Sequence, residues 1–183
     1  ALWPGGGFLS EDARLVELIL RESRRVVRMD KGILIVETHH GWICANGGVD
    51  QSNVDLDSAS LLPEDSDRSA RTLRERIRGL TGVDAAVIMS DTFGRPWREG
   101  LTNVAIGIAG LTPIKNYLGA QDPAGHTLQA TLLAVADELA GAAEPVMGKL
   151  NRVPVTIIRG LPFERGEGTS KALLRDPSRD LFR

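Results

Sequence analysis

The spacing of apolar residues changes several times along the chain, and each spacing predicts one element. Helical spacing first occurs within residues 10–28, where Ser10 can act as an N-cap and acidic residues follow it. The apolar stripe of this predicted helix consists of Leu15, Leu18, Ile19 and Val26. The basic residues near its end are Arg24, Arg25 and Arg28. Two further helices are predicted. One contains Ala70, Leu73, Ile77 and Leu80 and is closed by Gly79 and Gly82, and the other contains Leu128, Leu132, Val135, Ala136 and Leu139 and is broken by Pro145.

Runs rich in β-branched residues predict strands between these helices. "GILIVETHH" and "GWICANGG" (residues 32–48) form a predicted hairpin that turns at Gly41, and "VDAAVIM" (83–89) has the continuous apolar character of a buried strand. "TNVAIGIAG" (102–110) contains Gly107, which indicates a bulge or a close backbone approach. "VPVTIIRG" (153–160) is predicted to be the last strand, at a sheet edge because Pro154 lacks an N–H donor.

Helices that alternate irregularly with hairpin-like strands predict an α+β fold with a mixed, largely antiparallel sheet and packed helices. A length of 183 residues fits a single domain spanning residues 1–183. The chain is 42% apolar and 25% charged, as globular proteins are, and no apolar run reaches the roughly 20 residues that span a bilayer. We therefore expect a cytoplasmic protein with no membrane partner. A net charge of −2 argues against nucleic-acid binding, and the single Cys44 is predicted to be a buried structural thiol.

Two polar clusters directly follow predicted strands. "GGVDQSN" (47–53) contains Asp50, and "SDTFGRPWR" (90–98), which we interpret as a tight turn at the end of a strand, contains Asp91 and Thr92. Two carboxylates and a hydroxyl are hard oxygen donors, which suit Mg²⁺ or Mn²⁺ better than zinc. If the two strand ends meet at one sheet edge, the two aspartates converge there.

Arg95 and Arg98 add cationic groups to the second cluster and could bind phosphate oxygens in a bidentate manner. The alternative is structural: each aspartate caps its own backbone, and Arg98 forms a solvated pair with Glu99. Spacing alone favours this alternative over a metal site.

A glycine-rich stretch near the C-terminus, "RGLPFERGEGTSK" (159–171), contains Gly, Ser, Thr and Lys in an order that differs from a Walker A loop. Its backbone amides could form an anion-binding nest ahead of the short predicted helix "SKALLR". A plain surface loop is an equally good interpretation.

Several blocks taken together resemble the coenzyme F420:L-glutamate ligase family. They are "GGVDQSN", "SDTFGRPWREGLTNVAIGIAGL", "YLGAQDPAGHTL", "AVADELAGAA", "GKL…PVTIIRG" and "DLFR", and they occur in the family's order over nearly the whole chain after Lys31. The resemblance implies an F420 ligase-like fold, an intertwined homodimer and GTP-dependent amide-bond formation. L-Glutamate would be added to F420-0, and then to its γ-glutamyl tail, through an acyl phosphate.

The resemblance also implies roles for individual residues. Asp50 and Asp91 match ligands of a first divalent ion, Mg²⁺ or Mn²⁺, and Thr92 matches a ligand of a second, with a monovalent cation as an optional addition. Residues that match contacts to GTP, to substrate phosphate or to polyglutamate carboxylates are Asn53, Arg95, Arg98, Glu167, Thr169 and Ser170.

Family members are expected to begin several dozen residues earlier, with an "SK" segment that supplies part of the nucleotide site, and to continue beyond "DLF". We therefore expect this chain to be short at both ends relative to the family. That expectation motivates a second hypothesis, a non-catalytic relative or fragment that binds deazaflavin or metal. A generic metal-dependent phosphohydrolase would explain Asp50, Asp91 and Thr92 but not the other blocks.

Overall fold

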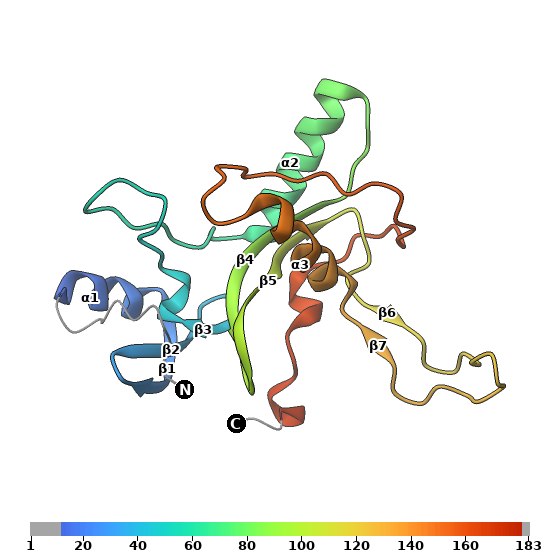
Figure 1. The fold of residues 1–183 in the computed structure, drawn as a ribbon, viewed down its shortest axis with the longest axis horizontal. Helices are drawn as coiled ribbons and strands as arrows, with labels where there is room; N and C mark the ends of the chain where they lie inside the picture. Colours follow the sequence, from blue (N-terminus) through green and yellow to red (C-terminus); the bar gives the residue numbers. More distant parts are fainter. Residues whose placement is uncertain (1–11, 181–183) are drawn as a thin grey trace. The chain divides into compact units, whose positions relative to one another are not determined.

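The computed structural model describes residues 12–180 and confirms the α+β class, with helices and antiparallel sheets (Figure 1). The chain divides into two compact units. The N-terminal unit comprises the residues up to Glu64 together with Phe93–Gly100, and the C-terminal unit comprises Asp65–Thr92 and the residues from Leu101 onward. The single domain spanning residues 1–183 stays a prediction. In the described residues the strands form separate sheets, β1-β2-β3, β4-β5 and β6-β7.

Helix α1 (Ala13–Arg21) opens the N-terminal unit and is shorter than the sequence predicted. Asp12 is its N-cap, because its carboxylate accepts a hydrogen bond from the N–H of Arg14 at 2.9 Å. The predicted cap Ser10 lies outside the described residues. The predicted helical positions Arg24, Arg25, Val26 and Arg28 instead belong to strand β1 (Ser23–Asp30), which corrects that prediction. Pairing of β1 with the next strand overrides the helical spacing here.

Strands β2 (Ile33–Thr38) and β3 (Ile43–Ala45) pair antiparallel, which confirms the predicted hairpin. Gly41 lies in its turn with a φ of +95°, a conformation that favours glycine. The core of this unit is formed by Ile19, Leu34, Val36 and Val49. Cys44 is also buried, as predicted.

Helix α2 (Ser66–Thr81) lies at the start of the C-terminal unit and confirms the helix predicted around Ala70 to Leu80. Asp65 caps its N-terminus by accepting from the N–H of Arg68 at 2.8 Å, and Gly82 ends it with a φ of +73°. Gly79 lies within the helix and does not help to close it, which corrects that detail.

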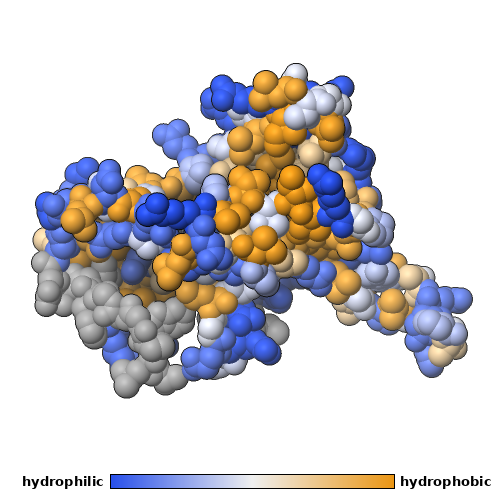
Figure 2. Space-filling view, turned by 45° about the horizontal axis from the view of Figure 1, so that its top comes forward, coloured by the Kyte–Doolittle hydropathy of each residue, from blue (hydrophilic) through white to orange (hydrophobic). Residues whose placement is uncertain are grey.

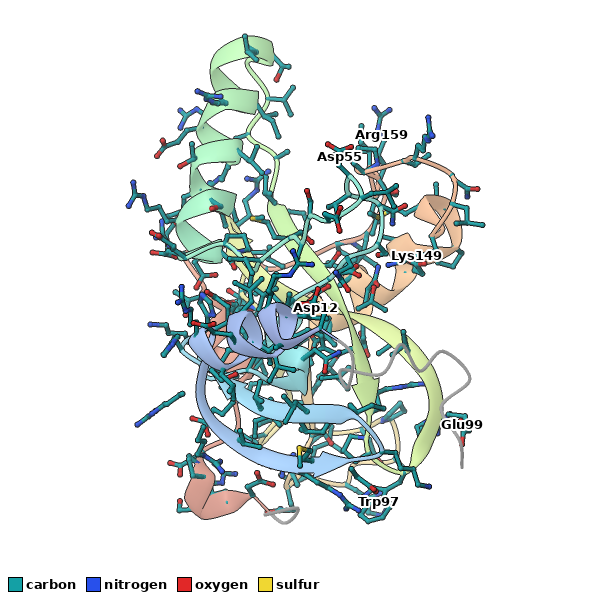
Figure 3. All side chains as sticks on the ribbon, turned by 90° about the vertical axis from the view of Figure 1, so that its left-hand side faces the viewer. Asp12, Asp55, Trp97, Glu99, Lys149 and Arg159 are labelled. Atoms are coloured by element: carbon teal, nitrogen blue, oxygen red, sulfur yellow. The ribbon has the colours of Figure 1, made fainter. Side chains whose placement is uncertain are left out.

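Strands β4 (Val87–Arg95) and β5 (Arg98–Ala109) form a hairpin, and β5 confirms the strand predicted at 102–110. The tight turn predicted within residues 90–98 is present but is confined to Pro96 and Trp97, because residues 90–95 continue β4, which corrects its extent. A β-branched Thr and an aromatic Phe suit an extended chain in this stretch. Trp97 lies at the hairpin tip, 86% exposed (Figure 3).

Gly107 of β5 permits the close backbone approach that the sequence indicated. A Cβ at this position would lie 2.5 Å from the carbonyl carbon of Ser66 at the start of α2. Glycine is therefore required for α2 to pack this tightly on β5. The adjoining core of the C-terminal unit consists of Ala105, Ile108, Leu111 and Ala136.

Helix α3 (Val135–Met147) confirms only the second half of the predicted helical stripe. Leu128 precedes the helix, and Leu132 belongs to the short strand β7 (Leu132–Leu133), which pairs with β6 (Lys115–Asn116). The helix continues for two residues past Pro145 and ends before Gly148, so the predicted break at Pro145 is also corrected.

The predicted last strand at 153–160 is not formed, although its residues have high β-propensity. In the described chain this segment is paired with no strand, and Val155 and Ile157 are more than 70% exposed. Three short 3₁₀ helices complete the described structure: η1 (Asn46–Gly48), η2 (Ser170–Leu173), which corresponds to the predicted "SKALLR" helix, and η3 (Pro177–Arg179). Over residues 12–180, no helix has the length and apolar character needed to cross a membrane.

Candidate functional site

Asp50 follows β3 in the N-terminal unit, two residues after the end of the η1 turn. Its backbone pairs with Ser60 through two hydrogen bonds of 3.1 and 2.8 Å. Its exposed carboxylate accepts hydrogen bonds from the N–H of Ser52, at 2.8 Å, and from the Ser52 hydroxyl. The local capping interaction considered for this residue is therefore present. A carboxylate has about four lone-pair sites, so this capping is compatible with a further contact to a cation.

Asn53 lies in the loop beyond Asp50, exposed and with a φ of +57°. Asparagine is among the few residues that adopt this left-handed conformation readily. The backbone of the loop therefore suits the residue that the sequence provides.

Asp91 and Thr92 lie within β4, in the C-terminal unit. The carboxylate of Asp91 accepts from the N–H of Thr92 at 2.7 Å. The hydroxyl of Thr92 donates to Oδ1 of Asn103 on β5 at 2.9 Å, and Nδ2 of Asn103 donates to Oε2 of Glu144 on α3, also at 2.9 Å. We call Thr92, Asn103 and Glu144 the Thr92 network. Asn103 is only 4% exposed, so its amide has little access to water.

Asp137 attaches α3 to the same strand, two helical turns before Glu144. Its carboxylate accepts from the N–H of Ala105 at 2.9 Å. Partial burial raises the pKa of Asp137, and the hydrogen bond from Ala105 opposes this rise. The sequence analysis did not single out Asn103, Asp137 or Glu144. The seven-residue spacing of the two acids could have indicated a shared helix face, but not what that face contacts.

Arg95 and Arg98 flank the hairpin tip and are exposed. Nη2 of Arg95 donates to the carbonyl oxygen of Glu99 at 3.2 Å. This tip groups with the N-terminal unit, whereas Asp91 and Thr92 group with the C-terminal unit. The predicted convergence of Asp50 with Asp91 stays a prediction.

The remaining predicted site residues lie in residues 164–170, which we call the strap; it has no helix or strand up to Thr169 and ends at the first residue of η2. Its start is fixed by a hydrogen bond from the N–H of Thr112 to the carbonyl oxygen of Glu164 at 2.9 Å. The strap residues Gly166 and Gly168 are pressed against the chain just after β5: a Cβ on Gly166 would lie 2.7 Å from Oγ1 of Thr112, and a Cβ on Gly168 would lie 2.6 Å from the carbonyl oxygen of Leu111.

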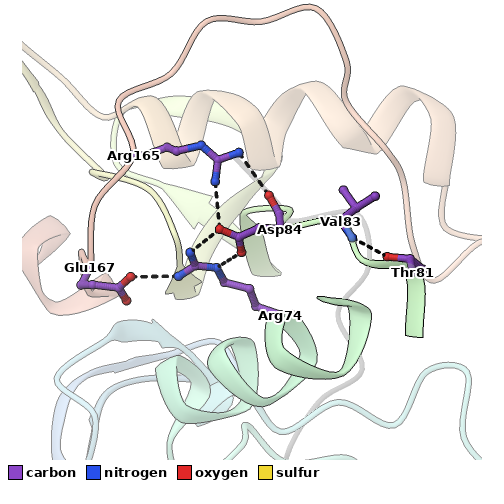
Figure 4. Close-up of polar contacts among 6 residues, drawn as sticks. All are labelled: Arg74, Thr81, Val83, Asp84, Arg165 and Glu167. Carbon is purple, nitrogen blue, oxygen red and sulfur yellow. Dashed lines mark hydrogen bonds and ion pairs between the residues drawn. The ribbon is translucent and has the colours of Figure 1, made fainter. Parts of the chain in front are cut away.

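The charged residues of the strap contact α2 and the loop after it (Figure 4). Glu167 accepts from Nη1 of Arg74 at 2.9 Å, and Arg165 donates to the carboxylate of Asp84 at 3.1 Å. Arg74 also holds Asp84 in a bidentate pair at 2.7 and 2.9 Å. The hydrogen bond from Arg74 is the main reason why the pKa of Asp84 is lowered, and the same pair raises the pKa of Arg74.

Asp67 on the first turn of α2 holds the other end of the strap. Its buried carboxylate accepts from the N–H of Ile108 at 2.8 Å, and from the N–H and hydroxyl of Ser170 at 2.9 and 3.1 Å. Ser170 is 4% exposed, whereas Glu167 and Thr169 are exposed. The strap is therefore buried at Ser170, while Glu167 and Thr169 remain open to solvent.

The predicted metal ligands have the right chemistry for a hard divalent ion. Asp50, Asp91 and Thr92 offer only carboxylate and hydroxyl oxygens, which Mg²⁺ and Mn²⁺ prefer. Within residues 12–180, no three His, Cys, Asp or Glu side chains form a group that could hold a metal ion. The predicted set differs from such a group, because it combines two carboxylates with a hydroxyl.

Comparison with known proteins places the chain in a family. Residues 7–160 match the family described as F420-0:Gamma-glutamyl ligase. The coenzyme F420:L-glutamate ligases of Methanopyrus kandleri and Methanothermobacter thermautotrophicus are each 48% identical to it, over 94% of this chain and 71% and 70% of their own lengths. The coenzyme F420:L-glutamate ligase of Methanocaldococcus jannaschii is 41% identical, over 94% of this chain and 70% of its length. This protein therefore belongs to the F420-0:gamma-glutamyl ligase family.

Proposed function

We propose that the protein is a ligase that joins L-glutamate to coenzyme F420-0 and to its growing γ-glutamyl tail, with GTP as co-substrate. The observation that carries the proposal is the 48% identity to two coenzyme F420:L-glutamate ligases over 94% of the chain. Identity at this level over almost the whole chain is difficult to reconcile with a generic phosphohydrolase, which would share only the acidic and hydroxyl residues.

The proposed reaction has two steps. A carboxylate oxygen of the acceptor attacks the γ-phosphorus of GTP, so that an acyl phosphate forms and GDP leaves. The amine nitrogen of L-glutamate then attacks the acyl carbon, and the new amide forms as phosphate leaves and the nitrogen loses a proton. The protein supplies position and charge stabilisation in this scheme and no nucleophile of its own.

Asp50 and Asp91 would hold one divalent ion and Thr92 a second. When bound, such ions stabilise the negative charge of a phosphoryl group during its transfer. Arg95 and Arg98, exposed at the hairpin tip, would bind anionic groups of the substrates, because guanidinium groups bind phosphate and carboxylate oxygens in pairs.

Four further residues would contact or position the nucleotide. We assign direct contacts to Asn53, Glu167 and Thr169, which are all exposed. Ser170 is buried against Asp67, so we assign it an indirect role in which it fixes the end of the strap.

The proposed function is tested by incubating the purified protein with F420-0, L-glutamate, GTP and Mn²⁺ and following product masses by liquid chromatography and mass spectrometry. We expect masses that rise in steps of one glutamyl residue, and loss of these products in Asp91→Asn. The matched control is Asp176→Asn, because Asp176 is a carboxylate of the same unit that caps a short 3₁₀ helix. A folded wild-type protein that binds Mn²⁺ but forms no product would overturn the ligase and favour a binding relative.

We also propose that two copies of the chain form an intertwined homodimer through residues 153–158. Val155 and Ile157 are 73% and 71% exposed, and this β-prone segment lacks a partner strand in the described chain. Broad apolar areas are visible on the surface in Figure 2. Exposed apolar surface combined with unsatisfied strand propensity is typical of an interface.

Analytical ultracentrifugation tests this assembly. We expect a dimer for the wild type and a monomer for Ile157→Lys. Leu56→Lys is the matched control, because Leu56 is a 96% exposed leucine of the N-terminal unit, and this variant should remain dimeric. A monomeric wild type, or the same mass for both variants, would contradict the proposal.

A further inference from the structure

The Thr92 network fixes the direction of each of its hydrogen bonds. An ionised carboxylate can only accept, so Glu144 must face the amide nitrogen of Asn103. That contact places Oδ1 of Asn103 toward Thr92 at 2.9 Å. Because Oδ1 is only an acceptor, Thr92 must be the donor in this bond. A carboxylate on α3 thus decides where a hydroxyl hydrogen on β4 points.

The direction of the Thr92 hydroxyl has a chemical consequence. A threonine that ligates a cation must offer an oxygen lone pair and must direct its hydrogen away from the ion. Donation to Asn103 uses the hydrogen and leaves both oxygen lone pairs as acceptors. If Asn103 were flipped, its NH₂ group would instead donate to the Thr92 oxygen and occupy one of these lone pairs. Burial of Asn103 keeps water from substituting for either partner.

We infer that Asn103 and Glu144 are positioning residues that hold the Thr92 hydroxyl in the orientation required to ligate a divalent ion. The inference rests on the proposed function, because it takes Thr92 as a metal ligand, and it adds two residues that act through Thr92. Carboxylates and amides that orient a metal ligand in this way commonly change metal affinity by one to two orders of magnitude when they are replaced.

The test is a titration of the purified protein with Mn²⁺ alone, in which free ion is measured by electron paramagnetic resonance. Glu144→Gln is the central variant: it keeps the shape of the side chain but can donate to Asn103, so the amide is free to flip. We expect about a tenfold loss of affinity at one of two Mn²⁺ sites. Thr92→Val should lose that site, and Thr92→Ser should restore it, because serine keeps the hydroxyl.

Asp137→Asn is the matched control for the loss of charge. Asp137 lies on the same helix and also bonds to β5, but through the backbone N–H of Ala105 and without contact to the Thr92 network. We expect this variant to bind Mn²⁺ as the wild type does. Equal losses in Asp137→Asn and Glu144→Gln, or wild-type affinity in Glu144→Gln, would overturn the inference.

The titration needs no turnover, so it separates this inference from the proposed function. Wild-type protein that binds two Mn²⁺ ions with the expected variant pattern but forms no glutamylated product would overturn only the ligase. Protein that forms product while Glu144→Gln and Thr92→Val bind Mn²⁺ normally would overturn only the inference.

Discussion

Two glycine-containing segments lie next to predicted site residues, one in each unit, and they use glycine for different reasons. In the η1 turn before Asp50, Gly47 and Gly48 have φ values of +64° and +72°, which residues with a Cβ rarely adopt. In the strap, Gly166 and Gly168 are needed because the chain after β5 leaves no room for a side chain. The first segment requires glycine for its backbone conformation and the second for close packing.

This difference shows why a glycine-rich sequence does not by itself identify a phosphate-binding loop. The strap resembles such a loop in composition, yet it is fixed by Asp67, Arg74 and Asp84. A glycine packed against another segment of the same chain should tolerate substitution differently from a glycine that only needs a left-handed backbone conformation. Four variants sharpen this comparison.

The largest effect is expected for Gly168→Ala. The added Cβ would lie 2.6 Å from the carbonyl oxygen of Leu111, a backbone atom that cannot move aside cheaply. We expect a loss of about 3 kcal/mol in the free energy of unfolding, measured with urea. Gly79→Ala is the control, because Gly79 lies in α2 with open space around it, and it should stabilise the protein slightly. A neutral Gly168→Ala would mean that the strap is not packed as described.

The second effect concerns the anchor of the strap. Asp67→Asn can keep an oxygen at Oδ1 for the N–H groups of Ile108 and Ser170, but it replaces a charged acceptor with a neutral one and places NH₂ at Oδ2, which also accepts from Ser170 N–H at 3.2 Å. We expect a cost of about 2 kcal/mol. Trypsin should then cut faster at Arg165 and Lys171, which flank the anchored end. Asp65→Asn should be close to neutral in both measurements, because asparagine caps helices as well as aspartate does. Unchanged cleavage in Asp67→Asn would show that the strap does not depend on this carboxylate.

A smaller effect, about 1.5 kcal/mol, is expected for Gly48→Ala. Its φ of +72° is strained for alanine, and the new Cβ would meet the side chain of Leu62 at 2.6 Å, a group that can rotate away. The double variant Gly48→Ala with Leu62→Ala separates the two contributions in urea unfolding. We expect the two losses to be less than additive. Strict additivity would assign the whole cost of Gly48→Ala to its backbone.

The smallest effect is expected from the ion pairs that attach the strap. The pKa of Asp84 lies below its ordinary value of 3.8, so its pairing stabilises the fold fully above about pH 4. This contribution is lost as the pH falls through the lowered pKa. Thermal unfolding midpoints of wild type and Asp84→Asn should therefore differ most at neutral pH and converge in acid. A difference that stays constant from pH 7 to pH 3 would rule out this origin.

The parts of the fold that the sequence predicts well are those set by local patterns. The hairpin at Gly41 and helix α2 depend on neighbours within a few residues. The errors arise where a distant partner decides the structure. Arg24 to Arg28 form a strand because they pair with β2, whereas residues 153–160 pair with no strand of the described chain.

The same distinction applies to the candidate site. Asp91 and Thr92 can be selected from the sequence because polar residues after an apolar run are conspicuous. Asn103 and Glu144 cannot, because Thr92 and Asn103 are 11 positions apart, and Asn103 and Glu144 are 41 positions apart. A sequence pattern contains the residue types but not the folding of α3 onto β5 that brings them into contact.

The carboxylates that attach helices to β5 also protect that strand from other molecules. A two-stranded ribbon leaves N–H groups on which a strand of another chain can build, and such open edges are common starting points of aggregation. On β5 the N–H groups of Ala105 and Ile108 already donate to Asp137 and Asp67. These two N–H groups are three residues apart and so point toward opposite edges of β5, and a strand approaching either edge at these positions would first have to displace a helix carboxylate. Acidic side chains thus shield the strand there in place of a neighbouring strand.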